Sequence, residues 1–293
     1  MIKQILFPIK TSIIRNNEYD HHYKFIYKYA KLNNINITTV SQSNNNKVFC
    51  NKLFFSILID NEQTIIDYSD HTKLSGNKYV TKVPYFKFHY SEKIHENHKG
   101  VYPIGPMLDI IDYNNYNYFF NYIKQNNYFP EKNDMILNLQ RPRYRAFVRR
   151  SEVQHMLKRK YRNMVKTVLD FKEDDQKYFW HQHKCCLLAV SVPGARNNML
   201  DRGHLEEFLM GVAVISPKII TMLPNNTKLI PNVHYIECKN NYSNLINIIE
   251  YYKKNKKKLK EIGNNAKKIL WNCYNPKNYW KWIEKCINNF KEK

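Results

Sequence analysis

Two nearly all-aliphatic runs in the second half of the chain limit its fold more than any other feature. They cover Leu187–Val192 and Val212–Ser216. Runs of this kind are typical of strands that are buried on both faces of a parallel sheet. The residues between them predict a polar loop and then a short helix over His204–Met210. This is the kind of connection that two parallel strands need.

Strands and helices alternate along the rest of the second half. Further strands are expected at Met135–Leu139, Val168–Phe171 and Val233–Glu237. Helices are expected after Ser151, which can act as an N-cap, and at Asp174–His183, Leu245–Lys254, Lys257–Trp271 and Asn278–Phe290. This alternation predicts a doubly wound α/β sheet.

The first half contains strands around one clear helix. Apolar side chains at three-and-four spacing predict this helix over Glu18–Leu32. Asp60-Asn61 predicts a turn between two of the strands. Strands are expected at Ile5–Ile9, Ile35–Val40, Phe54–Ile59, Thr64–Tyr68 and Val83–Tyr90, and a loop is expected at Tyr102–Pro106.

The chain has 293 residues, enough for two domains at roughly 150 residues each. We place the boundary near Phe129-Pro130, which gives an N-terminal domain of residues 1–130 and a C-terminal domain of residues 131–293. The predicted fold class is α/β, with two Rossmann-like domains that face a cleft. A cleft of this kind is a usual place for ligands.

Composition excludes several other classes of protein. Hydrophobic residues make up 43% of the chain, which argues against disorder. No apolar run approaches the roughly 18 residues of a membrane helix, so we predict no membrane span. The six cysteines form no C-x-x-C pair, so no disulfide framework is indicated and the expected location is the cytoplasm.

The net charge of +22 has two interpretations. A surplus of this size favours polyanions or phosphate-bearing ligands as partners. The alternative is the composition of an AT-rich genome, such as a viral one, whose product would work in the host cytoplasm. Lys, Asn, Ile and Tyr are abundant, and many of the lysines lie in Lys253–Lys260.

The loop between the two aliphatic runs carries the residues best suited to binding a ligand. Arg196 and Arg202 can meet phosphate oxygens, and Glu206 or Glu207 can accept two hydrogen bonds from a ribose diol. Loops at the carboxyl ends of parallel strands are where α/β folds bind ligands. The alternative is a plain crossover, in which Gly211 closes the helix and the glutamates are solvated.

This segment resembles the nucleotide-sugar-binding element of GT-B glycosyltransferases, especially the exostosin-like ones. In that family a strand ends in a Pro-Gly loop, an Arg follows, and a Glu lies five residues before a Gly that opens a Val-Ile strand. The matching positions here are Pro193-Gly194, Arg202, Glu206, Gly211 and Val214-Ile215. The likeness covers about His181 to Ala266, and Asn198 stands where many of these enzymes carry a second Glu.

The resemblance implies a metal-independent glycosyltransferase that needs no cofactor besides its nucleotide-sugar substrate. It implies that the C-terminal domain binds the donor, that the N-terminal domain presents a glycan or another hydroxyl acceptor, and that the C-terminal helices pack back. The implied donor-binding residues are Gly194, Arg196, Asp201, Arg202, Glu206 and Glu207, together with Arg141 and Arg143 of the basic segment after Met135–Leu139. That basic segment could instead be a solvated or nucleic-acid-binding surface.

Asp67, Asp70 and His71 are the catalytic candidates in the first half. An inverting transferase needs a carboxylate or a histidine to deprotonate the acceptor hydroxyl. The alternative is a strand-end turn with Asx hydrogen bonds. The stretch His181–Cys186 holds ligand types for zinc, but its cysteines run into an apolar strand, so we predict packing there and no metal site.

Two further functions stay open at this point. One is a glycosyltransferase that modifies DNA, since a basic protein can track a phosphate backbone. The other is a non-catalytic, basic nucleic-acid-binding protein of the same fold.

Overall fold

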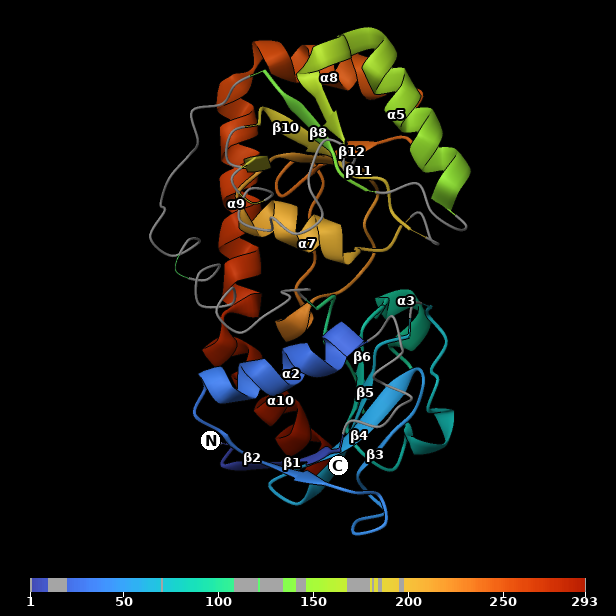
Figure 1. Cartoon of the computed structure of the whole chain (residues 1–293), viewed down its shortest axis with the longest axis vertical. Coiled ribbons are helices and arrows are strands. Elements are labelled where there is room, and N and C mark those ends of the chain that lie inside the picture. The colour runs from blue at the N-terminus through green and yellow to red at the C-terminus, as the bar shows by residue number, and fades with distance from the viewer. Residues whose placement is uncertain are drawn as a thin grey trace. The chain divides into compact units, whose positions relative to one another are not determined.

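The computed structural model describes residues 2–9, 20–69, 71–107, 121, 134–140, 146–167, 180, 182–183, 186–194 and 198–292, without the side chains of residues 20, 21 and 202. The chain forms two compact units (Figure 1). Unit 1 comprises Met1–Tyr116, Thr221–Lys228 and Asn272–Lys293, and unit 2 comprises Asn117–Ile220 and Leu229–Trp271. The last helix of the chain therefore belongs to unit 1.

Unit 2 is built on a five-stranded parallel sheet. Its strands are β8 (Ile136–Asn138), β9 (Val165–Thr167), β10 (Leu188–Val190), β11 (Val214–Pro217) and β12 (Ile236–Cys238), in the order β12-β11-β10-β8-β9. Every residue of Leu187–Val192 is fully buried. This confirms the prediction that the run forms a strand covered on both faces.

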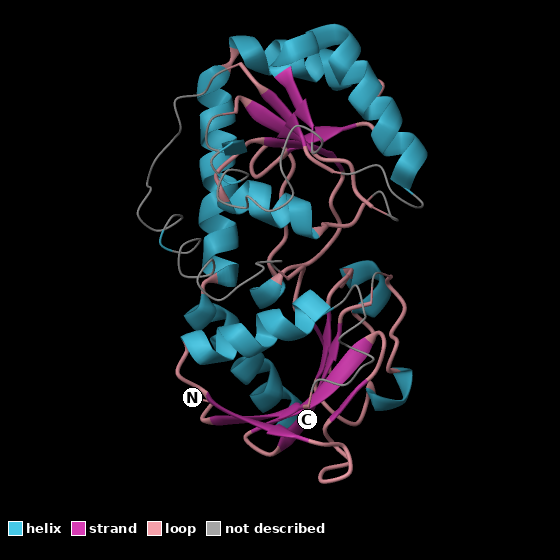
Figure 2. Cartoon of the chain, viewed as in Figure 1, coloured by secondary structure: helices cyan, strands magenta, loops and turns pink. Residues whose placement is uncertain are grey.

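Helices surround this sheet in Figure 2. They are α5 (Phe147–Tyr161), α7 (Arg202–Leu209), α8 (Leu245–Lys254) and most of α9 (Lys256–Tyr274). One hydrophobic cluster joins α5, α8 and the start of α9 to the strands through Leu157, Ile249 and Leu259. The apolar stripes of these helices therefore supply the core of unit 2.

Gly211 ends α7 as the sequence predicts. Its φ is +73°, a conformation that favours glycine, and its N–H donates to the carbonyl of Phe208 at 2.9 Å. A Cβ built on Gly263 of α9 would lie 2.2 Å from the backbone oxygen of Gly211. Helix α9 therefore packs backbone to backbone against the turn between α7 and β11.

Unit 1 contains a seven-stranded mixed sheet. Its strands are β1 (Gln4–Pro8), β2 (Asn36–Val40), β3 (Phe49–Cys50), β4 (Phe54–Ile59), β5 (Glu62–Asp67), β6 (Tyr85–Lys87) and β7 (Val101–Pro103), in the order β2-β1-β4-β5-β6-β7 with β3 on β4. Strand β4 runs antiparallel to both β1 and β5. Asp60 and Asn61 both have positive φ and close a two-residue hairpin, which leaves no room for a crossover. This sheet therefore departs from the doubly wound arrangement that we expected.

The helices of unit 1 are α2 (Asp20–Leu32), α3 (Glu92–His95) and α10 (Pro276–Lys291). Helix α2 connects the parallel strands β1 and β2. Its Phe25 and Tyr29 rings meet the Tyr279 ring of α10 edge-on, at 5.4 and 5.2 Å between centroids. Trp282 of α10 donates its Nε1–H to the carbonyl of Pro103 at 2.8 Å. These contacts dock the C-terminal helix onto unit 1.

Two local predictions need correction, and three others lie wholly or mostly outside the described residues. Helix α5 begins at Phe147, so Ser151 lies inside it and the N-cap prediction is wrong. Val101–Pro103 pairs with β6, so the start of the expected loop is a strand. The strand expected at Val168–Phe171 comes directly after β9 and lies outside the described residues. The boundary near Phe129-Pro130 and most of the helix at Asp174–His183 lie outside the described residues.

Within the described ranges, no helix is both long enough and apolar enough to cross a membrane.

Candidate functional site

The carboxyl edge of the unit 2 sheet has a point at which the direction of winding reverses. Read from β9 to β12, the strands follow the chain order 2-1-3-4-5, and the reversal lies between β8 and β10. Open α/β sheets bind ligands outside the carboxyl ends of the strands at such a switch point. The residues gathered around it, which we call the switch-point site, are Asn138, Gln140, Ser191, Pro193-Gly194, Asp201, His204, Glu206 and Glu207.

Gln140 ties the elements of this site together. Its side-chain oxygen accepts the N–H of Val192 at 3.2 Å. Its Nε2 donates to Ser191 Oγ at 2.7 Å and to Glu207 Oε1 at 3.3 Å. Its backbone carbonyl accepts from Gln154 of α5 at 3.2 Å. Through its side chain and its backbone carbonyl, this one buried residue therefore connects the ends of β8 and β10 to α7 and α5.

Glu207 is a buried carboxyl group in the middle of this network, with 1% of the residue exposed. Burial raises the pKa of Glu207 to about 7, although His204 and the hydrogen bonds from Ser191 and Gln140 act in the opposite direction. Glu207 Oε2 and Asn138 Oδ1 have no hydrogen-bond donor within the described part of the chain. The site therefore holds two buried acceptor oxygens and a carboxyl that titrates near neutral pH.

Asp201 begins α7 and holds the adjacent loop. Its Oδ1 accepts the backbone N–H of His204 at 3.2 Å, and His204 Nδ1 lies 2.8 Å from the same oxygen. The other ring nitrogen of His204 lies 3.0 Å from Ser216 Oγ on β11. Burial acts to raise the pKa of Asp201, but His204 and Arg150 outweigh it and hold this pKa well below its usual range. Asp201 is thus an ionised N-cap.

Two arginines of α5 hold the Pro193-Gly194 loop. Arg149 donates to the carbonyls of Pro193 and Gly194 at 2.5 and 2.7 Å. Arg150 donates to the carbonyl of Val192 at 2.9 Å and to Asp201 at 3.3 Å. Among the described residues, a Cβ on Gly194 would come within 4 Å of one atom, on the Arg150 guanidinium at 3.8 Å. The loop is therefore held by α5, and no described residue crowds Gly194.

The predicted donor-binding residues fall into two groups. Gly194, Asp201 and Glu207 come together at the switch-point site, and Glu206 is the neighbour of Glu207 on α7. Glu206 and Glu207 are 7% and 1% exposed, so the alternative of solvated glutamates is wrong. Arg202 is the first residue of α7, but its side chain lies outside the described residues, as do Arg141, Arg143 and Arg196.

Asp67, the first catalytic candidate, is buried in unit 1 among hydrogen-bond donors. Lys87 Nζ lies 2.9 Å from its Oδ1, and both side chains are fully buried. The N–H and Oγ of Ser69 donate to the same oxygen at 3.0 and 2.5 Å. Ser75 N–H donates to Oδ2 at 2.8 Å, and the Tyr85 hydroxyl donates to it as well. The bond from the Ser69 N–H, two residues along the chain, is an Asx hydrogen bond. The surroundings of Asp67 therefore match the alternative of a strand-end turn.

The other two catalytic candidates differ in what the structure shows. His71 is partly exposed, and its Nδ1 lies 3.0 Å from the carbonyl of Lys73. Asp70 lies outside the described residues. His71 therefore has surface available to a ligand, whereas Asp67 has none.

The His181–Cys186 stretch is described only in part. Cys186 is fully buried, and its thiol lies 3.2 Å from the carbonyl of His183, to which it donates. His181 and Cys185 lie outside the described residues. Among the residues that the structure does describe, no group of three or more His, Cys, Asp or Glu side chains is placed to hold a metal ion.

Sequence reasoning missed four residues of the switch-point site, namely Asn138, Gln140, Ser191 and His204. The spacing of Asp201 and His204 is that of an N-cap and the third helical residue, so this pair could have been found. Arg149 and Arg150 were considered only as part of a basic segment. Gln140 gives no signal, because strand pairing alone brings it to Ser191 and Glu207.

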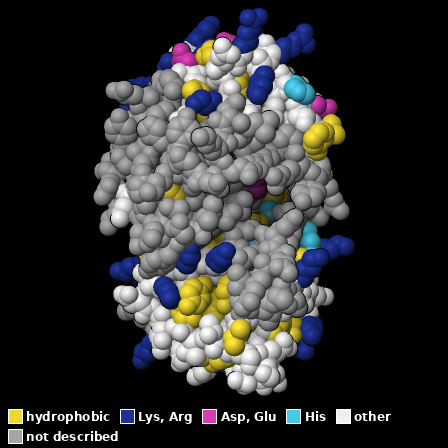
Figure 3. Space-filling model, in the orientation of Figure 1, with side chains coloured by type: hydrophobic (Ala, Val, Ile, Leu, Met, Phe, Trp, Pro, Cys, Tyr) yellow, Lys and Arg dark blue, Asp and Glu magenta, His cyan; other side chains and the backbone are white. Residues whose placement is uncertain are grey.

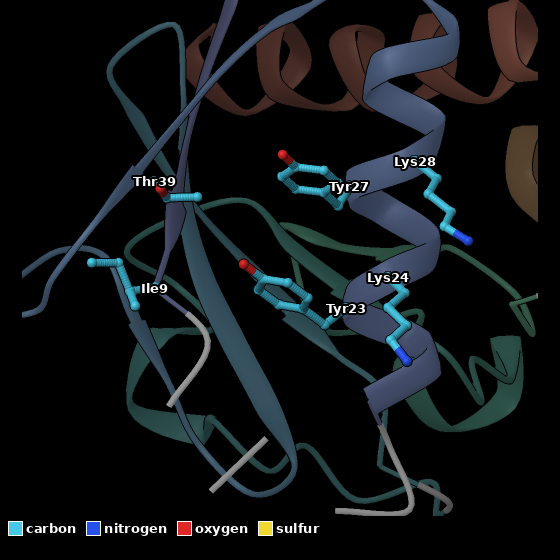
Figure 4. Close-up of a pocket in the computed structure, with 6 residues that line it drawn as sticks. All are labelled: Ile9, Tyr23, Lys24, Tyr27, Lys28 and Thr39. Carbon is cyan, nitrogen blue, oxygen red and sulfur yellow. The ribbon is translucent and has the colours of Figure 1, made fainter. Parts of the chain in front are cut away.

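Unit 1 has a hollow of about 310 Å³ beside the β1–β2 pair, shown in Figure 4. Tyr23 and Tyr27 extend from α2 toward Ile9 and Thr39, and their rings stack at 6.4 Å between centroids. The Tyr23 hydroxyl donates to the carbonyl of Pro8 at 2.7 Å, so this ring is held in place. The hollow offers an aromatic surface, and none of the predicted site residues lines it.

No protein-family model matches the chain, and no curated protein matches it. The residues of the switch-point site are therefore the basis for a functional proposal.

Proposed function

We propose that the protein is a glycosyltransferase, which binds a nucleotide-sugar at the switch-point site of unit 2 and transfers the sugar to a hydroxyl acceptor such as a glycan. The observation that carries this proposal is the convergence of the Pro193-Gly194 loop and the α7 carboxyl groups at the reversal between β8 and β10. Parallel sheets with this strand order bind nucleotides at that place. The resemblance of the loop segment to a nucleotide-sugar-binding element adds to the same argument.

In this proposal the two glutamates of α7 have different roles. Glu206, the more exposed of the two at 7%, accepts the ribose hydroxyls. Glu207 is a positioning residue, since it contacts Gln140 and, through it, the ends of both strands. The diphosphate binds beside Gly194, which no described residue crowds, and Arg196 and Arg202 bind its oxygens.

The proposed reaction breaks the bond between the anomeric carbon and a diphosphate oxygen, and a new bond forms to the acceptor oxygen. The electron pair of the broken bond goes to the leaving diphosphate, and cationic side chains stabilise this charge. The proton of the acceptor hydroxyl goes to a base, for which His71 is the described candidate with exposed surface. Unit 1 presents the acceptor, and no metal takes part.

The direct test is a thermal-shift screen of nucleoside-diphosphate sugars, with free sugars and inorganic phosphate as controls. A ligand at a hundred times its Kd stabilises the native protein by about 2.7 kcal/mol. We expect Glu206→Gln to abolish this shift while the apo melting temperature stays close to the wild-type value. If no nucleotide-sugar or nucleoside diphosphate shifts the wild-type protein, the donor site does not exist.

A further inference from the structure

A dense group of cations covers the side of unit 2 that is formed by α5, α8 and the start of α9. In Figure 3, Lys and Arg side chains gather at the upper end of the view, where Figure 1 shows α5 and α8. We call this group the lysine face, and it consists of Lys158, Arg159, Lys160, Lys253, Lys254, Lys256, Lys257, Lys258 and Lys260.

Contacts between α5 and α8 bring the cations of these two helices together, and the α9 lysines follow α8 directly in the chain. Lys253 Nζ of α8 lies 5.4 Å from the centroid of the Tyr161 ring of α5, and the Tyr161 hydroxyl donates to Glu250 Oε1 of α8 at 2.8 Å. Helix α9 begins after a single intervening residue. A hollow of about 460 Å³ lies between α5 and α8 and is lined by His155, Met156, Arg159, Lys160 and Ile246.

This arrangement is electrostatically unfavourable for the protein alone. Lys256, Lys257 and Lys258 lie at the start of α9, whose first turn has no acidic residue. Cations at a helix N-terminus are opposed by the helix dipole, and neighbouring like charges on a helix repel. Lys256 forms an ion pair with Asp134 at 2.8 Å. A bound polyanion would relieve this repulsion.

An exposed aromatic ring lies among these cations. Tyr251 is 51% exposed and precedes Lys254 by three residues, so the two side chains are neighbours on α8. The buried Tyr252 ring meets the Tyr251 ring edge-on at 5.0 Å, which restricts the position of Tyr251. Single-stranded nucleic acids bind to this combination, because bases stack on the ring while lysines contact phosphates.

We propose that the lysine face binds single-stranded nucleic acid, with Tyr251 stacked on a base and with Lys254, Lys257 and Lys258 at the phosphates. The alternatives are a duplex, whose bases are not available to an aromatic ring, and a sulfated polysaccharide, which has no base to stack. This binding surface is independent of sugar transfer at the switch-point site.

The test compares two triple variants in a fluorescence-anisotropy titration with a labelled oligothymidylate of about 20 nucleotides. The first is K254Q/K257Q/K258Q, and the matched control is K277Q/K281Q/K285Q on α10. Both remove three exposed lysines and the same charge. Each lost phosphate contact lowers the slope of log K against log salt by about 0.7. We expect a decrease of about two for the first variant and an unchanged slope for the control.

Tyr251→Ala separates base stacking from charge. We expect it to weaken oligothymidylate binding by about fivefold or more, with the salt slope and the affinity for heparin unchanged. Equal slopes in the two triple variants would overturn the assignment to the lysine face. An unchanged oligothymidylate affinity of Tyr251→Ala, tighter binding of a duplex or of heparin, or no binding at low salt would overturn single-stranded nucleic acid as the partner.

Discussion

The buried ion pair between Asp67 and Lys87 gives the sharpest test of how unit 1 is held together. Asp67→Asn keeps the size of the side chain but removes its charge. Lys87 Nζ would keep its bonds to the carbonyl and Oγ of Ser69, at 3.1 and 2.6 Å, and would lose its counterion in a fully buried place. Removing one partner of a buried pair costs about 3–5 kcal/mol. This is a large part of the 5–15 kcal/mol that is typical of a whole domain.

Urea unfolding followed by tryptophan fluorescence measures this free energy. The matched control is His71→Asn, at a partly exposed position four residues along the chain, which we expect to change the free energy of unfolding by less than about 0.5 kcal/mol. The double variant Asp67→Leu/Lys87→Met should cost less than the two single losses together, because it leaves no buried charge alone. A loss below about 1 kcal/mol for Asp67→Asn, together with lost transferase activity, would refute the structural role and identify Asp67 as a catalytic base.

Three further predictions follow from buried groups. Because burial raises the folded-state pKa of Glu207 from its ordinary 4.5 to about 7, the folded protein binds this proton more tightly than the unfolded chain, so stability falls as pH rises through that window. Glu207→Gln should remove this part of the fall in the free energy of unfolding, roughly 3 kcal/mol. Urea unfolding of the two proteins from pH 4 to 8 measures it, and parallel stability profiles would contradict the prediction. Gly263→Ala should cost about 1–3 kcal/mol, because its Cβ meets a backbone oxygen at 2.2 Å. Gly194→Ala, at a position that no described residue crowds, should keep the wild-type melting temperature but weaken nucleotide-sugar binding. Equal melting temperatures of the two variants would show that the close approach at Gly263 is tolerated. Trp282→Phe leaves a buried carbonyl of β7 without its donor and should lower the free energy of unfolding by about 1–3 kcal/mol, whereas an unchanged urea midpoint would show that the bond contributes nothing.

Local patterns in the sequence were sufficient to find most strands and helices. A continuous aliphatic run such as Leu187–Val192 can be covered on both sides only inside a sheet, and the structure buries all of it. Helix α8 has the predicted bounds, Leu245–Lys254, because its apolar residues recur at helical spacing. The position of Gly211 after α7 was also predictable, since a helix end that needs positive φ favours glycine.

Helix starts and strand directions were less accessible from local patterns. Ser151 has the right chemistry for an N-cap, but α5 begins four residues earlier at Phe147, after Ala146, which makes no side-chain cap bond. The direction of β4 depends on the hairpin at Asp60-Asn61. The sequence predicted a turn there, but it did not show that this turn makes β4 and β5 antiparallel.

Tertiary structure alone decided which side chains act together. Asp67 is matched to Lys87, twenty residues away, because β5 and β6 pair in parallel register. Gln140 reaches Glu207 across 67 positions because β8 and β10 are neighbours in the sheet and α7 follows β10. Periodicity and propensity concern residues within a few turns of one another, so they determine elements. Strand order and register bring distant residues together, and they determine whether a carboxylate such as Asp67 holds the fold or remains available for chemistry.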